Sequence, residues 1–443
     1  MPKCQLAMFK RLCQCEAKTG SQPWISLLGS AKVGDAKVKA IRLADAVAAI
    51  PTQLAPIPDT EEVGIAGARG RVLATDLVAQ VNLPQWDSSA VDGFAIRAAD
   101  LVPDRVNRLR VIGEAAAGHP FAGDLAPGQA VRILTGAPLP RGADVVVMQE
   151  VCRINGADLL VKGGAASKKH WRPRGEDICL GAKAITAGRR LRAQDVALAG
   201  ALGCNQLRVR RQPRVGLFST GDELCEPGNV LASGQIWDAN RCILRGLLEH
   251  LGCQIVDFGI LRDEPRLLEG ALSRAAHDCD LLVTSGGMSV GSEDYMRSII
   301  GRRGVLELWP LAIKPGKPVG FGDIDDCAIL ALPGNPIAAV VAFIAIGRAV
   351  VDVIAGASHD PPRPLSMPAG FSFDKKSSVR QFLLGELRTD GDGKSVVIPC
   401  ERQGTAVLSG LAASDGFIVL DEDREIVRPG EFVDFIALQG YLA

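Results

Sequence analysis

Three polar segments that contain glycine each follow an apolar run in the second half of the 443-residue chain. They are residues 219–223, residues 284–291, which continue to Glu293 and Asp294, and residues 332–336. Glycine lets the backbone approach a ligand closely, and exposed N–H groups then form a nest that binds anions. The hydroxyls add donors, and the carboxylates can hold a magnesium ion. One such segment is weak evidence, but three at consecutive strand ends of one sheet predict an anion site.

A lysine-proline loop, Lys314-Pro315-Gly316-Lys317-Pro318, follows the second of these segments. The prolines stiffen the loop and hold two ammonium groups near each other. Like charges held close together are unfavourable unless an anion lies between them, so the loop favours an oxyanion site over a solvated surface loop.

A third feature, DSSAVDG, places two serines between Asp87 and Asp92, with Gly93 directly after the second carboxylate. Asp and Ser bond their own backbone and Gly accepts positive φ, so taken alone the segment is typical of a turn.

The secondary structure that would position these residues differs between parts of the chain. From residue 211, apolar strands alternate with helices at 240–251, 265–276 and from about 293, which predicts a parallel sheet covered on both faces. Ligands of such sheets bind outside the carboxyl ends of the strands. Residues 105–165 form short β-rich runs broken by Gly and Pro, and a Pro-rich linker after 358 precedes a further β unit.

Composition excludes some classes of function. Lysine plus arginine and aspartate plus glutamate each number 50, so no net charge attracts nucleic acid or a membrane surface. The 12 cysteines form no CxxC pair and no zinc spacing, and we expect reduced thiols in a cytoplasmic protein. No secretory signal is evident, and the apolar run 337–346 is about half a membrane span, which predicts a buried helix.

Taken together, the motifs indicate a family. In chain order they are DSSAVDGFA, ILTGAPLPRGADVVVMQE, RPRGEDI, STGDEL, the turn at 238–240, TSGGMSVGSEDY, LAIKPGKPVGFG and ALPGNP. The chain resembles the molybdopterin molybdenumtransferase family, the MoeA proteins and the related domain of gephyrin, over roughly residues 40–440.

The resemblance implies a multidomain α/β plus β fold with a three-layer molybdopterin-binding domain. We expect an N-terminal extension, poorly ordered, at 1–40, and an elongated helical and β segment used in dimerisation at 41–80 and 178–210. The small β domain would be 81–177, the α/β domain 211–357 and the C-terminal, barrel-like β domain 358–443. The family forms homodimers.

The resemblance also implies the chemistry. Molybdate reacts with adenylylated molybdopterin, AMP leaves, molybdenum ends on the pterin dithiolene, and Mg²⁺ is required. By the matching motifs, Asp294 and Glu223 would hold the metal or orient the departing phosphate, and Asp87, Thr135 and Asp177 would complete the site from the partner subunit. The residues expected to bind the pterin, the phosphate or the oxometalate are Ser219, Thr220, Gly221, Asp222, Asp238, Asn240, Ser285, Gly286, Gly287, Ser289, Lys314, Lys317, Pro336, Arg380 and Thr405.

The chain departs from the family pattern around the expected oxyanion pocket. Ala338 replaces the usual serine after PGNP, a GRxEFxRG pattern keeps only Arg380 among its polar residues, and a GSG-like turn reads Gly404-Thr405-Ala406. A preference for tungstate over molybdate therefore stays open. Two other functions stay open as well: the molybdopterin adenylyltransferase of the same pathway, and a non-catalytic scaffold that binds cofactor. Transient contacts with that adenylyltransferase and with apo molybdoenzymes are expected.

Overall fold

The structure is a computed structural model that describes residues 40–164, 170–262, 264–286, 295–359, 363–376 and 378–439. The chain divides into two compact units, one of residues 60–209 and one that combines residues 1–59 with 210–443. Gly287, Ser289, Asp294 and the expected N-terminal extension lie outside the described residues, apart from residue 40.

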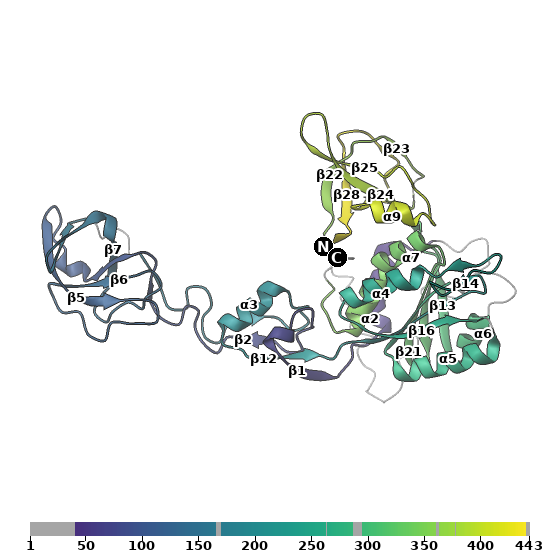
Figure 1. Ribbon diagram of the computed structural model, residues 1–443, viewed down its shortest axis with the longest axis horizontal. Coiled ribbons are helices and arrows are strands. Elements are labelled where there is room, and N and C mark those ends of the chain that lie inside the picture. The colour runs from purple at the N-terminus through teal and green to yellow at the C-terminus, as the bar shows by residue number, and fades with distance from the viewer. Residues whose placement is uncertain are drawn as a thin grey trace, which may run out of the picture. The chain divides into compact units, whose positions relative to one another are not determined.

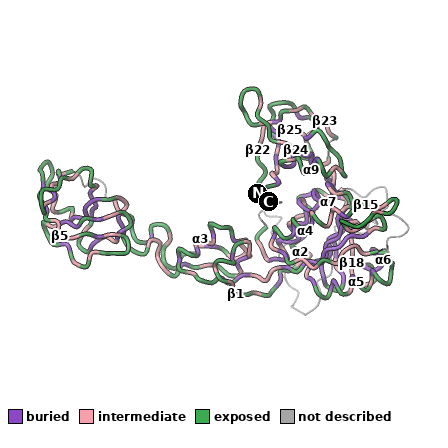
Figure 2. Tube along the Cα trace, viewed as in Figure 1, coloured by how far each residue is buried: buried purple, intermediate pink, exposed green. Residues whose placement is uncertain are grey.

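A six-stranded sheet forms the centre of the larger unit. Its order is β16 (Gln254–Leu261), β13 (Arg214–Thr220), β17 (Leu281–Ser285), β21 (Cys327–Leu332), β20 (Val319–Ile324) and β18 (Gly304–Trp309). The inner strands β13, β17 and β21 are almost completely buried (Figure 2). Continuous apolar strands of this kind are typical of sheets covered on both faces.

Helices cover both faces of this sheet, as predicted (Figure 1). One face packs against α4 (Asn240–His250), α7 (Pro336–Ala342) and α8 (Arg348–Ile354), which a π-helical turn joins to α7. The other face packs against α5 (Pro265–Asp278) and α6 (Tyr295–Arg303). Alternation decides the face: Leu217 and Val283 face the first core, whereas Phe218 and Leu282 face the second.

The expectation of a wholly parallel sheet was wrong. Strands β16, β13, β17 and β21 are parallel, but β20 runs antiparallel to both β21 and β18. Only Asp325 and Asp326 connect β20 to β21, and both have positive φ, +48° and +64°. A two-residue connection of this type makes a hairpin, because a parallel pair would need a crossover of a dozen residues or more.

Helix α2 (Leu43–Gln53) belongs to the α/β core and not to the segment expected for residues 41–80. Its apolar stripe of Leu43, Ala46 and Ile50 packs into the same core as α8. The run that was expected to be a buried helix is confirmed: Pro336–Ile354 is long and apolar enough to cross a membrane, yet 83% of its 18-residue window is buried inside the protein.

The C-terminal β unit packs directly on the α/β domain. Its sheet has the order β19 (Ile313–Lys314), β24 (Arg380–Thr389), β26 (Gly416–Leu420), β28 (Phe432–Ala437) and β22 (Leu365–Pro368), and β25 (Ser395–Pro399) pairs with β24. Phe382 and Phe417 belong to the same core as Ile337 of α7. One strand of this sheet, β19, comes from the lysine-proline loop, so the loop joins the two domains.

The smaller unit is rich in β structure, as its sequence predicts. Its main sheet has the order β7 (Val145–Met148), β4 (Gly93–Ile96), β6 (Gln129–Ile133), β5 (Val106–Ala115), β9 (Asp158–Lys162) and β8 (Cys152–Asn155). Three two-stranded pairs accompany it: β3 (Ser88–Ser89) with β10 (Trp171–Arg172), β2 (Leu77–Val78) with β11 (Lys183–Ile185), and β1 (Thr60–Gly64) with β12 (Gln206–Arg210). One helix, α3 (Ala193–Ala201), packs near β11.

Candidate functional site

The three polar segments predicted from the sequence begin side by side at one edge of the α/β sheet. The last residues of the central strands are in register, with Ser219 of β13 opposite Ser285 of β17 and Ser285 opposite Leu332 of β21. The Gly286 N–H donates to the Leu332 carbonyl at 3.2 Å, which ties the second segment to the third. Parallel strand order therefore gathers these segments at the carboxyl edge, where ligands of such sheets bind.

Buried hydroxyls without partners mark this edge. Ser219 and Thr220 are 1% and 3% exposed, and neither of their hydroxyl oxygens, nor that of Thr284, has a hydrogen-bond partner among the described residues. Buried polar groups are nearly always hydrogen-bonded, because an unpaired one costs about 1–3 kcal/mol. The Ser219 and Thr220 oxygens, at the end of β13, are therefore suited to a polar ligand there.

Asn240 ties the segments together from the start of α4. Its side-chain amide donates to Ser285 Oγ at 2.7 Å and to the Gly334 carbonyl at 2.5 Å, and Ser285 Oγ donates to the Pro333 carbonyl at 3.1 Å. The Asn240 Oδ1 is buried and has no partner among the described residues. The side chain thus fixes two segments and retains one acceptor.

The first segment holds its glycine and its acid close together. Gly221 has φ of +144°, a conformation that side chains rarely adopt, and a Cβ there would collide with the carboxylate of Glu223. Glu223 and its neighbour Asp222 are exposed. Among the described residues, no group of three or more His, Cys, Asp or Glu side chains is placed to hold a metal ion.

Asp238, expected to bind the cofactor, is held inside the protein. It is 1% exposed, and Arg241 donates to it from Nε at 3.1 Å and from its backbone N–H at 3.2 Å. Arg241 also bonds Asp257 at 2.7 Å and Glu226. Burial alone would raise the pKa of Asp257, but the hydrogen bonds from Arg241 and from the Gly259 N–H lower it below its usual value.

The lysine-proline loop lies against the first turns of α7. A Cβ on Gly316 would lie 3.3 Å from the Ala338 carbonyl oxygen and 3.4 Å from the Ala342 nitrogen. Lys314 and Lys317 are exposed, and neither forms a hydrogen bond or ion pair with any residue that the structure describes. Two ammonium groups without carboxylate partners are what an oxyanion site needs.

The structure gives Arg380 other partners than the expected oxyanion. Its guanidinium pairs with Asp421 at 2.8 Å and with Glu422 at 3.2 Å. In the β19–β24 pairing Lys314 is opposite Gln381, whereas Arg380 is opposite Ile313. Opposite residues of a parallel pair point to the same face, and neighbouring residues of a strand point to opposite faces. The side chains of Arg380 and Lys314 therefore lie on opposite faces of this sheet.

Thr405 and Pro336 do lie next to each other. The Thr405 carbonyl accepts the N–H of Ile337 at 3.0 Å, which satisfies one of the free donors in the first turn of α7. Pro336 occupies the first position of that helix, where its missing N–H has no cost. The Thr405 turn of the C-terminal unit is thereby fixed beside the third polar segment.

In the smaller unit, residues 83–92, which include Asp87, form hydrogen bonds to the segments of Thr135 and Asp177. Asp87 accepts the Arg174 N–H at 2.7 Å, and the Asp177 N–H donates to the Leu83 carbonyl at 3.0 Å. Thr135 donates to Asp92 from its N–H at 2.7 Å and its hydroxyl at 2.8 Å, and these bonds lower the pKa of Asp92. The turn predicted from DSSAVDG therefore forms, with Asp92 holding Thr135.

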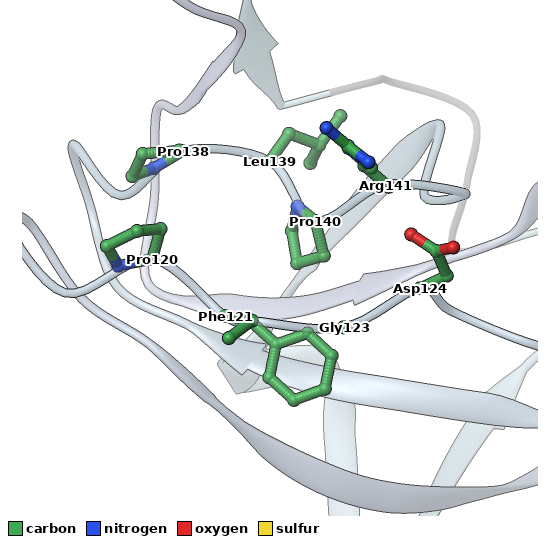
Figure 3. Close-up of a pocket in the computed structure, with 9 residues that line it drawn as sticks. Pro120, Phe121, Gly123, Asp124, Pro138, Leu139, Pro140 and Arg141 are labelled. Carbon is green, nitrogen blue, oxygen red and sulfur yellow. The ribbon is translucent and has the colours of Figure 1, made fainter.

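The smaller unit contains a pocket of about 490 Å³, whose lining residues Figure 3 shows. It contains no residue predicted for the site; its lining is Pro120, Phe121, Ala122, Gly123, Asp124, Pro138, Leu139, Pro140 and Arg141. The Leu139 N–H donates to the Asp87 carbonyl at 2.8 Å, so the pocket adjoins the Asp87 turn. The motif APLPRGAD contained four of these residues, but sequence reasoning took only Thr135 from that region.

Comparison with known proteins decides the family. Family models match at residues 41–203 (MoeA N-terminal region, domain I and II), 216–352 (probable molybdopterin binding domain) and 366–438 (MoeA C-terminal region, domain IV). A molybdopterin molybdenumtransferase from Haemophilus influenzae is 36% identical over 382 residues, which are 85% of this chain and 94% of that protein. The chain belongs to the molybdopterin molybdenumtransferase (MoeA) family.

Further members of the MoeA family agree. Molybdopterin molybdenumtransferase 2 of Mycobacterium tuberculosis is 33% identical and covers 83% of this chain and 92% of its own length. The crystal structure of the molybdopterin biosynthesis MoeA protein from Pyrococcus horikoshii OT3 has a TM-score of 0.75 at 28% identity, covering 90% of this chain and 100% of that one. The multidomain α/β plus β fold predicted from the sequence is confirmed.

Two of the three departures from the MoeA pattern, Ala338 and the Thr405 turn, lie together in space. Ala338 is buried in the first turn of α7, against Gly316 of the lysine-proline loop, and the Thr405 turn contacts the same helix end. Two contacts were not predicted from the sequence: Gln381, part of the altered pattern around Arg380, lies opposite Lys314, and Arg241 bonds three carboxylates. An arginine directly after the recognised turn at 238–240 was the available signal for the second.

Proposed function

We propose that this chain is a molybdopterin molybdenumtransferase, which inserts molybdenum from molybdate into adenylylated molybdopterin and releases AMP. Family membership over most of the chain supports the reaction. The observation that carries it to this chain's own residues is the edge where β13, β17 and β21 end, with buried hydroxyls that have no partner among the described residues.

The reaction requires several anions to be held together, because a dianionic oxometalate must approach a phosphate and two sulfurs. Placement and charge supply most of the catalysis in such a case. Ser219, Thr220 and Ser285 would cradle the pterin and phosphate, with backbone approach at Gly221 and Gly286. Lys314 and Lys317 would attract the oxometalate, since both lack carboxylate partners among the described residues.

Magnesium is the divalent ion that we propose for this site, and among the described residues Glu223 is the carboxylate that would help to hold it. Mg²⁺ is commonly held by one or two carboxylates together with substrate phosphates, and it keeps several waters. Glu223 is exposed at the strand edge and can serve as one such ligand, with Asp294 as the second. The bound ion would supply positive charge that stabilises the departing phosphate.

We further propose a cytoplasmic homodimer in which Asp87, Thr135 and Asp177 complete the site of the partner subunit. The free state of the cysteines in the described residues is consistent with a reducing compartment. Co-expression of a Lys317→Ala chain with an Asp87→Asn chain tests the shared site. A mixed dimer contains one intact site, so co-expression should restore about a quarter of wild-type activity with random pairing and about a half in purified mixed dimers. No recovery would contradict a shared site.

The decisive assay supplies purified protein with adenylylated molybdopterin, molybdate and Mg²⁺. We expect AMP release and reconstitution of an apo molybdoenzyme, both abolished by Asp294→Ala. Formation of adenylylated molybdopterin from molybdopterin and ATP by this chain alone would favour an adenylyltransferase. Binding of molybdopterin without AMP release would favour a scaffold. Parallel reactions with tungstate measure the oxyanion preference that the changes around Ala338 leave open.

A further inference from the structure

The side chain of Arg241 is the centre of an ion-pair cluster at the N-terminal end of α4. The side chain is only 12% exposed, and it bonds three carboxylates from three different parts of the chain. Asp238 precedes α4, Glu226 follows strand β14 (Leu224–Cys225), and Asp257 belongs to β16. One guanidinium therefore fixes α4 relative to the chain that follows the first polar segment and to the edge strand of the sheet.

This cluster lies directly beside the residue that connects the other two polar segments. Asn240, the neighbour of Arg241 in the chain, bonds Ser285 Oγ and the Gly334 carbonyl. The backbone adds a second link, since Asp238 N–H donates to the Cys225 carbonyl at 2.9 Å and Ile236 N–H to the Glu223 carbonyl at 2.8 Å. A shift of α4 would therefore move Asn240 and the backbone of Glu223 together.

Only an arginine can make these contacts at once. Its planar group presents five N–H donors in a fixed fork, whereas lysine carries one compact ammonium. Arg241 uses Nε for Asp238, one terminal nitrogen for Asp257 and the other for Glu226. A lysine would keep the charge next to the buried Asp238 but could not reach three carboxylates on diverging elements.

We propose that Arg241 is a positioning residue of the molybdenumtransferase site, which acts through Asn240 by fixing the start of α4 against the strand ends. This inference rests on the proposed function. It predicts that a change at Arg241 alters substrate binding through the same amide that Asn240 supplies. Arg241 itself contacts the carboxylates and need not touch the substrate.

Arg245 provides a matched control on the same helix. It also pairs with Asp257, and with Glu249 at 3.7 Å, but it bonds neither Asp238 nor Glu226. Arg245→Lys thus makes the same chemical change at the same partner carboxylate, one turn further from the site. A merely electrostatic or structural contribution to α4 would respond to both substitutions.

The experiment is a double-mutant cycle of Arg241→Lys and Asn240→Ala, measured by AMP release and by equilibrium binding of molybdopterin. Each single variant should lower kcat/KM about tenfold, the effect of one or two hydrogen bonds. The double variant should also lose about tenfold instead of about a hundredfold, because both act on one group. Arg245→Lys should stay within about twofold of wild type.

Three results overturn the proposal: a double variant that loses about a hundredfold, an Arg245→Lys loss equal to that of Arg241→Lys, or wild-type kinetics for Arg241→Lys. Should Arg241→Lys not fold, Glu226→Gln takes its place in the cycle, because it removes one partner and leaves Arg241 with two. Wild-type protein that binds molybdopterin but releases no AMP contradicts the proposed function. In that case the double-mutant cycle is evaluated from the affinity for molybdopterin alone.

Discussion

Substitution of Gly286 by alanine tests directly whether the strand ends form the substrate cradle. Gly286 has φ of +92°, and a Cβ there would lie 2.6 Å from the Thr220 carbonyl oxygen and 3.5 Å from Thr220 Oγ1. The backbone conformation alone costs a residue with a side chain about 1–2 kcal/mol. Overpacking against a rigid strand adds about 1–3 kcal/mol. We expect the free energy of unfolding to fall by about 2–5 kcal/mol.

The same clash should reduce activity, because it separates the end of β17 from the end of β13. Thr220 carries one of the buried hydroxyls that have no partner among the described residues, so the displaced group is part of the proposed cradle. We expect kcat/KM to fall at least about tenfold, the effect of losing a well-placed hydrogen bond to a charged group. AMP release and denaturant unfolding on the same preparation give both quantities.

Gly393 is the matched control for this substitution. It has φ of +78° in the turn between β24 and β25, and a Cβ there would meet nothing within 4 Å. Gly393→Ala should therefore cost only the backbone contribution, about 1–2 kcal/mol, and leave kcat/KM unchanged. Wild-type activity in a folded Gly286→Ala protein would refute the cradle, and equal destabilisation by both substitutions would refute the clash.

Three further predictions concern charge. Hydrogen bonds from Thr135 lower the pKa of Asp92, so the stability that the ionised Asp92 contributes is present above its ordinary pKa and is lost as the pH falls through the lowered value. Thr135→Val removes the hydroxyl, and the pKa of Asp92 measured by NMR should rise. An unchanged pKa would contradict the role of the hydroxyl. Lys317→Gln should weaken molybdate binding about tenfold at low ionic strength and less at about 0.5 M salt. Equilibrium dialysis measures the affinity. An equal loss of affinity at both salt concentrations would argue against an electrostatic role. Chelation of divalent cations should slow AMP release about tenfold or more. Glu223→Gln should raise the Mg²⁺ concentration that gives the half-maximal rate of AMP release. The same Mg²⁺ dependence in this variant as in the wild type would remove Glu223 from the metal site.

The sequence predicted the α/β layers well because the signals there are local. Apolar strands followed by glycine and hydroxyl residues indicated the ends of β13, β17 and β21, and the start of α4 at Asn240 follows a recognised turn. The antiparallel β20 was missed although its signal was also local. Asp325 and Asp326 stand alone between two apolar runs, which is the spacing of a hairpin.

Pairings between distant residues could not be predicted in the same way. The apolar stripe of α2 predicts a buried face but not which core it enters, and the structure places it against α8. The partners of Arg241 are 3, 15 and 16 residues away, on elements whose order in the sheet is not written in the sequence. Asp92 was assigned to a turn from the sequence, but its bonds from Thr135, 43 residues away, were not predicted.

Arg380 shows why a matching motif does not fix the role of a charged side chain. A cation attracts an oxyanion strongly only if its charge is not already neutralised, and Arg380 is bonded to Asp421 and Glu422. Lys314 and Lys317 have no such partners among the described residues, so they retain the charge that an oxometalate requires. Binding of molybdate should therefore depend more on Lys314 and Lys317 than on Arg380, because an anion at Arg380 must first displace two carboxylates.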